Sequence, residues 1–479
     1  MEVPSAALEF RTIQLKDRRL EDRARLILGR LEAAPDVGFP QAMKEAAEVE
    51  AFYRFTNNPR VWWEELLAAH ARESWLRADS IGPCLVLHDT TEMAFPGEAE
   101  RVGLEKRASK SVFHAHVALA VSEGEAAVVH GVVGMRNYII EDHAWVEVDG
   151  RGEGKELLSG ANRWGDLVAD VHAEAGLTRP LIHVMDREAD DYTLMSKILD
   201  HQGNFVIRSL HDRTVDPLGG SAVGGDPGGS GKLTAALAGV SYSVSRPVQL
   251  SRRGSRRLPA DRKTHPDRES RVARLQFRWT AVDLRRPGGV GKSGPSTLKV
   301  WVVEVVEPEP PPGEAPVYWR LLTSLPIENA EDALRVVDIY RKRWLIEEYF
   351  RTLKTGCSAE KRQAESLSAL LNVTCLLVPV AWRLMVLREV ARNEPEGPAS
   401  LILDDIEIQA LRHISPRAKF SAQPKAREAI AAIARLGGHL RSNGEPGILV
   451  LFRGLQQLLA FAAGWRAAVL ALHAAPAVN

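Results

Sequence analysis

Acidic residues occur where two apolar segments of the sequence end. The segment Cys84-Leu-Val-Leu-His-Asp89 predicts a buried strand that finishes at Asp89, and Leu181-Ile-His-Val-Met185 predicts another that is followed by Asp186. We expect the two carboxylates to lie side by side at one edge of a sheet. A single Asp at a strand end is more often structural than functional, so a site requires further residues.

A third carboxylate lies on a helix that the sequence predicts over residues 330–354. Five polar or charged residues of this helix are spaced at offsets of 0, 3, 7, 11 and 14: Tyr340, Arg343, Glu347, Arg351 and Lys354. At about 100° per residue they fall on one narrow stripe. A solvated face with an ordinary i, i+4 ion pair is the alternative interpretation. Most other positions are apolar, which favours a stripe that faces a cleft or a partner.

Three carboxylates from two strand ends and one helix suggest metal-dependent chemistry on a phosphodiester. Hard cations prefer oxygen ligands, and carboxylates provide them. Two such ions can activate a water or a 3′-hydroxyl group and can stabilise the leaving oxygen. The neighbouring Arg and Lys side chains would then hold phosphates.

The elements that must position these residues belong to a chain of ordinary globular composition. Its 479 residues are 45% hydrophobic and 26% charged, and 62 basic side chains balance 62 acidic ones. This length allows two to four domains. Zero formal charge excludes a protein that coats nucleic acid over its whole surface, but it allows local basic patches. Three widely spaced cysteines, Cys84, Cys357 and Cys375, indicate a reducing compartment without a zinc module.

Neither a signal peptide nor a membrane span is predicted. The N-terminus lacks a basic start followed by an apolar stretch. The longest apolar run, residues 369–382, contains Asn372 and Pro379 and stops at Arg383, which is shorter than the roughly 20 apolar residues of a membrane span. We expect a buried helix and a soluble, cytoplasmic protein.

Hydrophobic periodicity predicts an α/β fold with a mixed sheet. Strand patterns over residues 84–89, 116–121 and 127–133 suggest an antiparallel meander, and a helix over 155–176 precedes further strands. A β-rich insertion with Gly/Pro/Ser-rich and Arg-rich stretches follows. The predicted divisions are a helical N-terminal segment, a first core part, the insertion, a second core part and a helical C-terminal segment: 1–75, 76–210, 211–316, 317–365 and 366–479.

The first helix of the chain is unevenly charged. Residues 11–30 contain seven basic and three acidic side chains, with apolar residues near helical spacing. A solvated amphipathic helix is one interpretation. A helix that contacts phosphates is the other.

The spacing Tyr340-x2-Arg343-x3-Glu347-x6-Lys354 resembles the Y-x2-R-x3-E-x6-K signature of bacterial insertion-sequence-four-type (IS4 family) DDE transposases. His88-Asp-Thr-Thr91 is similar to the first-aspartate motif of this family, and Val184-Met-Asp-Arg-Glu-Ala-Asp190 to the second. Residues 53–59 and 433–438 resemble its terminal domains, so the similarity extends from about residue 10 to about residue 470.

The resemblance implies an RNase H-like catalytic core, an N-terminal DNA-binding domain and a C-terminal dimerisation domain. It implies that Asp89, Asp186 and Glu347 form the catalytic triad and hold two Mg²⁺ ions, for which Mn²⁺ could substitute. The DNA-binding residues would be Tyr340, Arg343, Arg351, Lys354, Trp319 and Arg25. Trp319 would stack on a flipped base, whereas the sequence alone favours a core strand residue.

The implied activity is cut-and-paste transposition by a homodimer bound to the inverted repeats of a transposon. One strand is nicked, its 3′-hydroxyl attacks the other strand to form a hairpin, and the reopened end is transferred to target DNA. The expected setting is the bacterial cytoplasm, on DNA and away from membranes. The alternatives are a domesticated or inactive sequence-specific DNA-binding protein and a simple metal-dependent nuclease. All three carboxylate positions are filled, which argues against an inactive protein.

Overall fold

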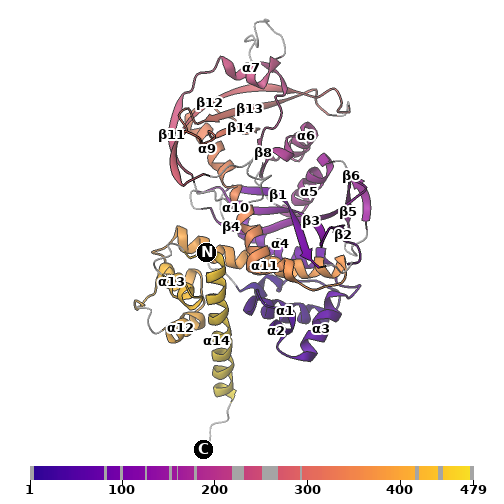
Figure 1. The fold of residues 1–479 in the computed structure, drawn as a ribbon, viewed down its shortest axis with the longest axis vertical. Coiled ribbons are helices and arrows are strands. Elements are labelled where there is room, and N and C mark those ends of the chain that lie inside the picture. The colour runs from indigo at the N-terminus through magenta and orange to yellow at the C-terminus, as the bar shows by residue number, and fades with distance from the viewer. Residues whose placement is uncertain are drawn as a thin grey trace, which may run out of the picture.

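The computed structural model describes most of the chain. The described residues are 5–79, 83–97, 101–124, 127–149, 154–158, 160–176, 181–217, 231–250, 268–291, 294–415, 420–440 and 446–474. The Gly-rich stretch of the predicted insertion and most of its Arg-rich stretch lie outside these residues. Figure 1 shows the N- and C-terminal helices at one end of the molecule and the insertion strands at the other.

The N-terminal segment is helical, as predicted. Its elements are η1 (Ala6–Phe10), α1 (Arg18–Ala33), α2 (Phe39–Met43), α3 (Ala46–Thr56) and α4 (Trp63–Asp79). Helix α1 begins after Asp17, whose carboxylate accepts a hydrogen bond from the backbone N–H of Arg19 at 3.0 Å and caps the helix. Its buried face consists of Ala24, Ile27, Leu28 and Leu31.

One mixed sheet runs through the centre of the molecule. Within the described residues it contains fourteen strands in the order β10-β9-β12-β13-β14-β8-β7-β1-β3-β4-β5-β6, with β11 beside β12 and β2 beside β3. The strands are β1 (Cys84–Pro96), β2 (Glu105–Arg107), β3 (Lys110–Ser122), β4 (Val129–Glu141), β5 (Ala144–Val148), β6 (Gly154–Leu158), β7 (Ile182–Met185), β8 (Asn204–Arg208), β9 (Thr214–Pro217), β10 (Gly231–Lys232), β11 (Val244–Leu250), β12 (Arg271–Arg285), β13 (Thr297–Val306) and β14 (Tyr318–Thr323).

The strand directions confirm the predicted α/β fold with a mixed sheet. Strand β1 pairs antiparallel with β3, and β3 pairs antiparallel with β4. On its other side β1 pairs parallel with β7, which pairs parallel with β8. The insertion strands join the same sheet, because β13 pairs with β14 and β14 pairs with β8.

Helices cover both faces of the central strands. Helix α5 (Gly160–Ala175) packs on one face, where Leu167 and Val171 contact Val86 and Ala118. Helix α6 (Tyr192–Asp200) follows the short η2 (Arg187–Ala189), and α7 (Leu233–Ala238) lies on the insertion. The predicted helix over 155–176 starts too early, because residues 154–158 form the edge strand β6 and pair with β5.

The predicted helix over 330–354 is divided into three parts, so a single helix was wrong here. The parts are α9 (Ala330–Arg341), α10 (Trp344–Arg351) and the π-helical η3 (Thr352–Gly356), and η4 (Ala359–Lys361) follows. Between α9 and α10, the N–H groups of Lys342 and Arg343 bond the carbonyls three residues earlier, at 3.1 and 3.0 Å. Such i→i−3 bonds tighten the turn and redirect the chain.

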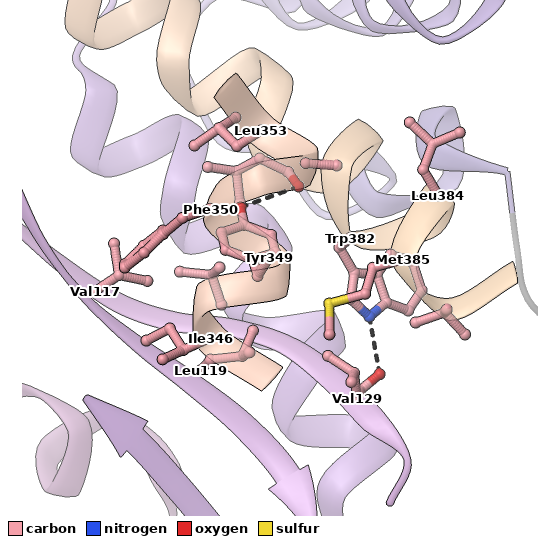
Figure 2. Close-up of a cluster of buried hydrophobic side chains, with 14 of the residues drawn as sticks. Val117, Leu119, Val129, Ile346, Tyr349, Phe350, Leu353, Trp382, Leu384 and Met385 are labelled. Carbon is pink, nitrogen blue, oxygen red and sulfur yellow. Dashed lines mark hydrogen bonds between the residues drawn. The ribbon is translucent and has the colours of Figure 1, made fainter. Parts of the chain in front are cut away.

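Helix α10 is anchored by its apolar side chains. Ile346, Tyr349 and Phe350 are buried, and Figure 2 shows them beside Val117 and Leu119 of β3. The Tyr349 hydroxyl donates a hydrogen bond to the carbonyl of Val378, at 3.4 Å. This packing fixes α10 on the sheet face opposite α5 and sets the direction of its polar residues.

The C-terminal segment is helical, as predicted. It comprises α11 (Leu367–Asn393), η5 (Ala399–Leu401), α12 (Asp405–Ile414), α13 (Ala426–Leu436) and α14 (Ile448–Ala474). Among the described helices, α11 alone has the length and composition of a membrane span, but its apolar window is 100% buried inside the protein. The buried helix predicted around residues 369–382 is thereby confirmed. In Figure 1, α14 extends beyond the helices that it packs on.

Candidate active site

The sheet register brings the two aspartates together. Strands β1 and β7 are parallel neighbours in which Leu87 pairs with Val184. Asp89 lies two residues further along β1, and Asp186 lies two residues after Val184, directly after the end of β7. Asp89 faces away from α5, since side chains alternate between the two faces of a sheet, and Asp186 caps η2 by accepting a hydrogen bond from the backbone N–H of Glu188 at 2.9 Å.

Helix α10 adds Glu347, and Arg343 connects it to the sheet. The Arg343 guanidinium donates a hydrogen bond to Asp89 Oδ2 at 3.2 Å and another to Glu347 Oε1. These side chains are partly buried, with exposed fractions of 17% for Arg343, 20% for Asp89 and 33% for Glu347. The structure therefore joins two of the three predicted triad residues through one cation.

Burial and crowding of negative charge distinguish Asp89 from the other acidic residues. Burial raises the pKa of Asp89 to about 7, and the nearby Asp186 and Glu347 carboxylates act in the same direction, against the opposing effect of Arg343. The charged form of a carboxyl group is disfavoured when it leaves water and meets other anions. A cation placed among these carboxylates would relieve both effects.

The three carboxylates are the right donors for Mg²⁺ or a similar hard cation. Asp186 and Glu347 both raise the pKa of Asp89. Among the residues that the structure describes, however, no group of three or more His, Cys, Asp and Glu side chains is arranged to hold a metal. The donor set fits a divalent cation, while a guanidinium lies between two of the donors.

Three other predicted site residues have different surroundings. Tyr340 is nearly buried and meets Trp319 in an edge-on contact, with ring centroids 5.9 Å apart. Trp319 itself is half-buried on β14. Arg25 lies on α1, where it donates a hydrogen bond to the Phe10 carbonyl at 3.1 Å and pairs with Asp22.

The two cations at the end of the predicted stripe have partners outside the triad. Arg351 is paired with Glu348 at 2.9 Å. Lys354 Nζ donates a hydrogen bond to the carbonyl of Glu92, and Glu360 lies 3.4 Å from it. Lys354, on η3, thus contacts β1 three residues beyond Asp89.

The structure also reveals a basic cavity that the sequence did not indicate. A cavity of about 170 Å³ is lined by Arg187, Arg208, Ser209, Leu210, Tyr318 and Arg320. Arg187 directly follows Asp186, and the positive charges of Arg187 and Arg343 both lower the pKa of Arg208, after the larger effect of burial. Arginines at the ends of neighbouring strands were the signal in the sequence that could have revealed this cavity.

Asp190 holds the loop that forms one wall of the cavity. Its buried carboxylate accepts hydrogen bonds from the backbone N–H groups of Leu210 and His211, at 2.7 and 2.9 Å. It also pairs with Arg213 at 2.6 Å. The loop after β7, which carries Asp186, is thus connected to the loop after β8.

Comparison with known protein families identifies the class of this protein as a transposase. Residues 4–61 match the family described as Transposase DNA-binding, and residues 160–378 match the Transposase DDE domain. Residues 379–472 match the Transposase Tn5 dimerisation domain. The protein is therefore an enzyme that cleaves DNA and transfers phosphoryl groups.

The order of the three matches is that of the Tn5/IS4-type DDE transposases, and the chain belongs to this family. Among solved structures, it is similar to a cryo-EM structure of a piggyBac transposase synaptic complex with hairpin DNA. The two share 10% sequence identity at a TM-score of 0.35, over 96% of this chain and 74% of the other.

Proposed function

We propose that this transposase excises and inserts its DNA element by the cut-and-paste route. The observation that supports the proposal is the register of β1 and β7, which puts Asp89 on β1 and Asp186 directly after its parallel neighbour, with Glu347 joined to Asp89 through Arg343. The proposed steps are a nick at the transposon end, hairpin formation, hairpin opening and strand transfer. The proposed setting is the bacterial cytoplasm.

Asp89, Asp186 and Glu347 would hold two Mg²⁺ ions, or Mn²⁺ in their place. When bound, the ions supply Lewis-acid stabilisation of the phosphoryl oxygens and lower the pKa of a bound water. The residues of the chain itself orient the DNA around this point. We propose that Arg343 binds the phosphate next to the scissile bond, because a guanidinium can donate two parallel N–H hydrogen bonds to a phosphate.

We propose that the basic cavity is a second binding site for the DNA backbone. Arg187, Arg208 and Arg320 line it directly beside Asp186, and clustered arginines attract phosphates. Trp319 lies next to Tyr340. We propose that its indole stacks on an unpaired base during the hairpin step, while Arg351 and Lys354 contact the backbone after their present partners are exchanged for phosphate.

The N-terminal helices would recognise the inverted repeat. Several arginines there are well exposed, with side-chain exposures of 91% for Arg18, 72% for Arg54 and 75% for Arg60. Arg25, whose guanidinium already bonds the Phe10 carbonyl, would contact the end sequence from the same helix as Arg18. The C-terminal helices would join two copies of the chain in a synaptic dimer.

The test is an excision assay on a plasmid that carries the element between its own inverted repeats. Purified wild-type protein with Mg²⁺ is compared with Asp186→Ala, and the products are resolved on denaturing gels. We expect excised fragments with hairpin ends from the wild type only. DNA that is retarded but uncut in both samples would instead identify a DNA-binding protein without the chemistry. Nicks without hairpins or insertion would identify a simple nuclease.

A further inference from the structure

We infer that Arg343 keeps the metal site closed in the DNA-free protein and that DNA opens it by drawing this guanidinium onto a phosphate. The inference rests on the proposed function of the triad. It adds a coupling: the metal and the DNA would each bind more tightly when the other is present.

The first observation is the position of the guanidinium. Arg343 donates to Asp89 Oδ2 through one terminal nitrogen and to Glu347 Oε1 through the other. The same two carboxylates would have to hold the ion. Mg²⁺ needs its oxygen ligands at about 2.0–2.1 Å in near-octahedral geometry, so an ion would compete with the guanidinium for Asp89 Oδ2 and Glu347 Oε1.

The second observation is that Arg343 stays charged beside these carboxylates. Burial acts against its charge, yet Tyr340, Glu347 and Asp89 together raise its pKa, so the guanidinium is charged at every pH of interest. A divalent ion that enters the site without DNA would therefore have to displace a charged guanidinium from both carboxylates.

A DNA phosphate changes this balance. It offers Arg343 a bidentate partner next to the basic cavity, where Arg187 and Arg208 also lie. Transfer of the guanidinium from carboxylates to phosphate would free Asp89 and Glu347 for the metal. By thermodynamic linkage, the factor by which DNA tightens metal binding must equal the factor by which metal tightens DNA binding.

Arg343 then has two successive roles. Its planar fork can bridge two carboxylates, and the same fork can bind a phosphate. In the free protein it neutralises crowded anions in place of a metal. The consequence is an enzyme that carries little bound metal until it meets DNA.

The experiment measures Mn²⁺ binding to the full chain by the loss of the free Mn²⁺ EPR signal, without any turnover. Wild type, Arg343→Gln and Arg335→Gln are compared in the absence of DNA. Arg335 lies on α9 and pairs with Glu123, away from the triad, so it controls for the loss of an arginine. We expect Arg343→Gln to bind Mn²⁺ about tenfold more tightly than the other two, equivalent to ~1.4 kcal/mol.

A second arm adds a short duplex that carries the element's end sequence, in Ca²⁺-free buffer at fixed salt. The duplex should tighten Mn²⁺ binding to the wild type by about the same factor, on the order of tenfold, and should have little effect on Arg343→Gln. Arg343→Lys covers the case in which the Gln variant does not fold. Its ammonium lacks the rigid planar fork of the guanidinium and holds two carboxylates less firmly, so its Mn²⁺ affinity should exceed that of the wild type.

Equal Mn²⁺ affinities for wild type and both Arg343 variants without DNA would overturn the inference while leaving the triad intact. Equal tightening by DNA in wild type and variants would overturn it as well. Failure of the proposed function has a different signature. In that case Mn²⁺ would not bind with or without DNA, or Asp89→Asn would bind it as well as the wild type does.

Discussion

At Asp89, burial and neighbouring negative charges act in the same direction. Its pKa is raised from 3.8 to about 7 by burial first and then by Asp186 and Glu347, against Arg343. Between these two pH values the unfolded chain releases the proton while the folded protein keeps it. The stability of the metal-free protein therefore decreases, through this residue, as the pH rises from about 4 to 7.

Asp89→Asn should remove this dependence. We expect the metal-free variant to melt at a higher temperature than the wild type at pH 8 and at nearly the same temperature at pH 4, where both side chains are neutral. Differential scanning fluorimetry in EDTA across this range measures the difference. Parallel melting curves for the two proteins over the whole range would contradict the assigned pKa.

Glu347→Gln should separate catalysis from DNA binding. The amide preserves the shape of the side chain but removes one negative charge from the triad, so we expect DNA cleavage to decrease by about a hundredfold or more. End binding in a gel-shift assay should stay nearly unchanged. Glu331→Gln, an exposed site on α9, serves as the matched control. Equal loss of cleavage and binding would count against a catalytic role.

At the scale of secondary-structure elements, a cluster of histidines lies between the core strands and α5, on the sheet face opposite Asp89. His88 Nε2 and His183 Nδ1 are 2.9 Å apart, and His183 Nε2 lies 3.0 Å from His172 Nε2 on α5. His116 shares a hydrogen bond with Thr90 at 2.9 Å. Burial lowers the pKa of His116 to about 3 and that of His172 to about 4, and it lowers the pKa of His88 and His183 well below the usual value.

This histidine cluster predicts sensitivity to acid. Below pH 6.5 the unfolded chain gains protons on these imidazoles. The folded protein gains them at lower pH, near pH 3 for His116 and pH 4 for His172, so stability falls as the pH decreases. We expect the apparent melting temperature to fall between pH 6.5 and 5, and to fall less in His183→Gln. Calorimetry on both proteins tests this. An unchanged slope in the variant would mean that other groups cause the acid response.

The loops after β7 and β8 depend on each other through Asp190. Asp190→Ala would leave Arg213 without its 2.6 Å partner and would free the N–H groups of Leu210 and His211. Breaking a buried ion pair from one side costs about 3–5 kcal/mol. We expect a loss of this size in urea unfolding and a smaller loss in Asp190→Asn. A loss under about 1 kcal/mol for the Ala variant would rule out this connection.

Across the whole molecule, a buried arginine joins the N- and C-terminal helices to the central helix α11. Arg383 on α11 pairs with Glu32 of α1 and, at 3.3 Å, with Glu407 of α12. Its side chain is 3% exposed, and the two carboxylates are 10% and 2% exposed. The DNA-binding and dimerisation segments that the family comparison identifies are thus connected through one buried ion network.

Arg383→Met should weaken this connection strongly, because it removes the guanidinium from two buried carboxylates. Glu32 would keep the N–H of Ala6, and Glu407 would keep the N–H of Asp404 and Arg466 at 3.9 Å. The expected loss is about 3–5 kcal/mol in urea unfolding. Adding Glu32→Gln and Glu407→Gln should restore much of the lost stability, since the triple variant buries no unpaired charge. If the triple variant is no more stable than Arg383→Met, the loss comes from packing and not from unpaired charge.

The sequence by itself was sufficient for the fold class and the helical ends, and it proposes the triad. Apolar runs of strand length end at Asp89 and Asp186, but the prediction that the strand ends at Asp89 was wrong, because β1 continues to Pro96 through its pairing with β3. The motif around Glu347 then identified the family. These are local patterns, and hydrophobic periodicity records them because each element must bury one face.

Only the tertiary structure decided how these elements meet. The turn between α9 and α10, the π-helical turn before Gly356 and the fusion of the insertion with the core sheet depend on packing and register between distant segments. The same holds for the Arg343 bridge, the basic cavity and the histidine cluster, whose members lie far apart in the chain. These ion pairs and buried clusters form between surfaces that come together only when the sheet and the helices have assembled. The spacing of residues along the sequence therefore could not predict them.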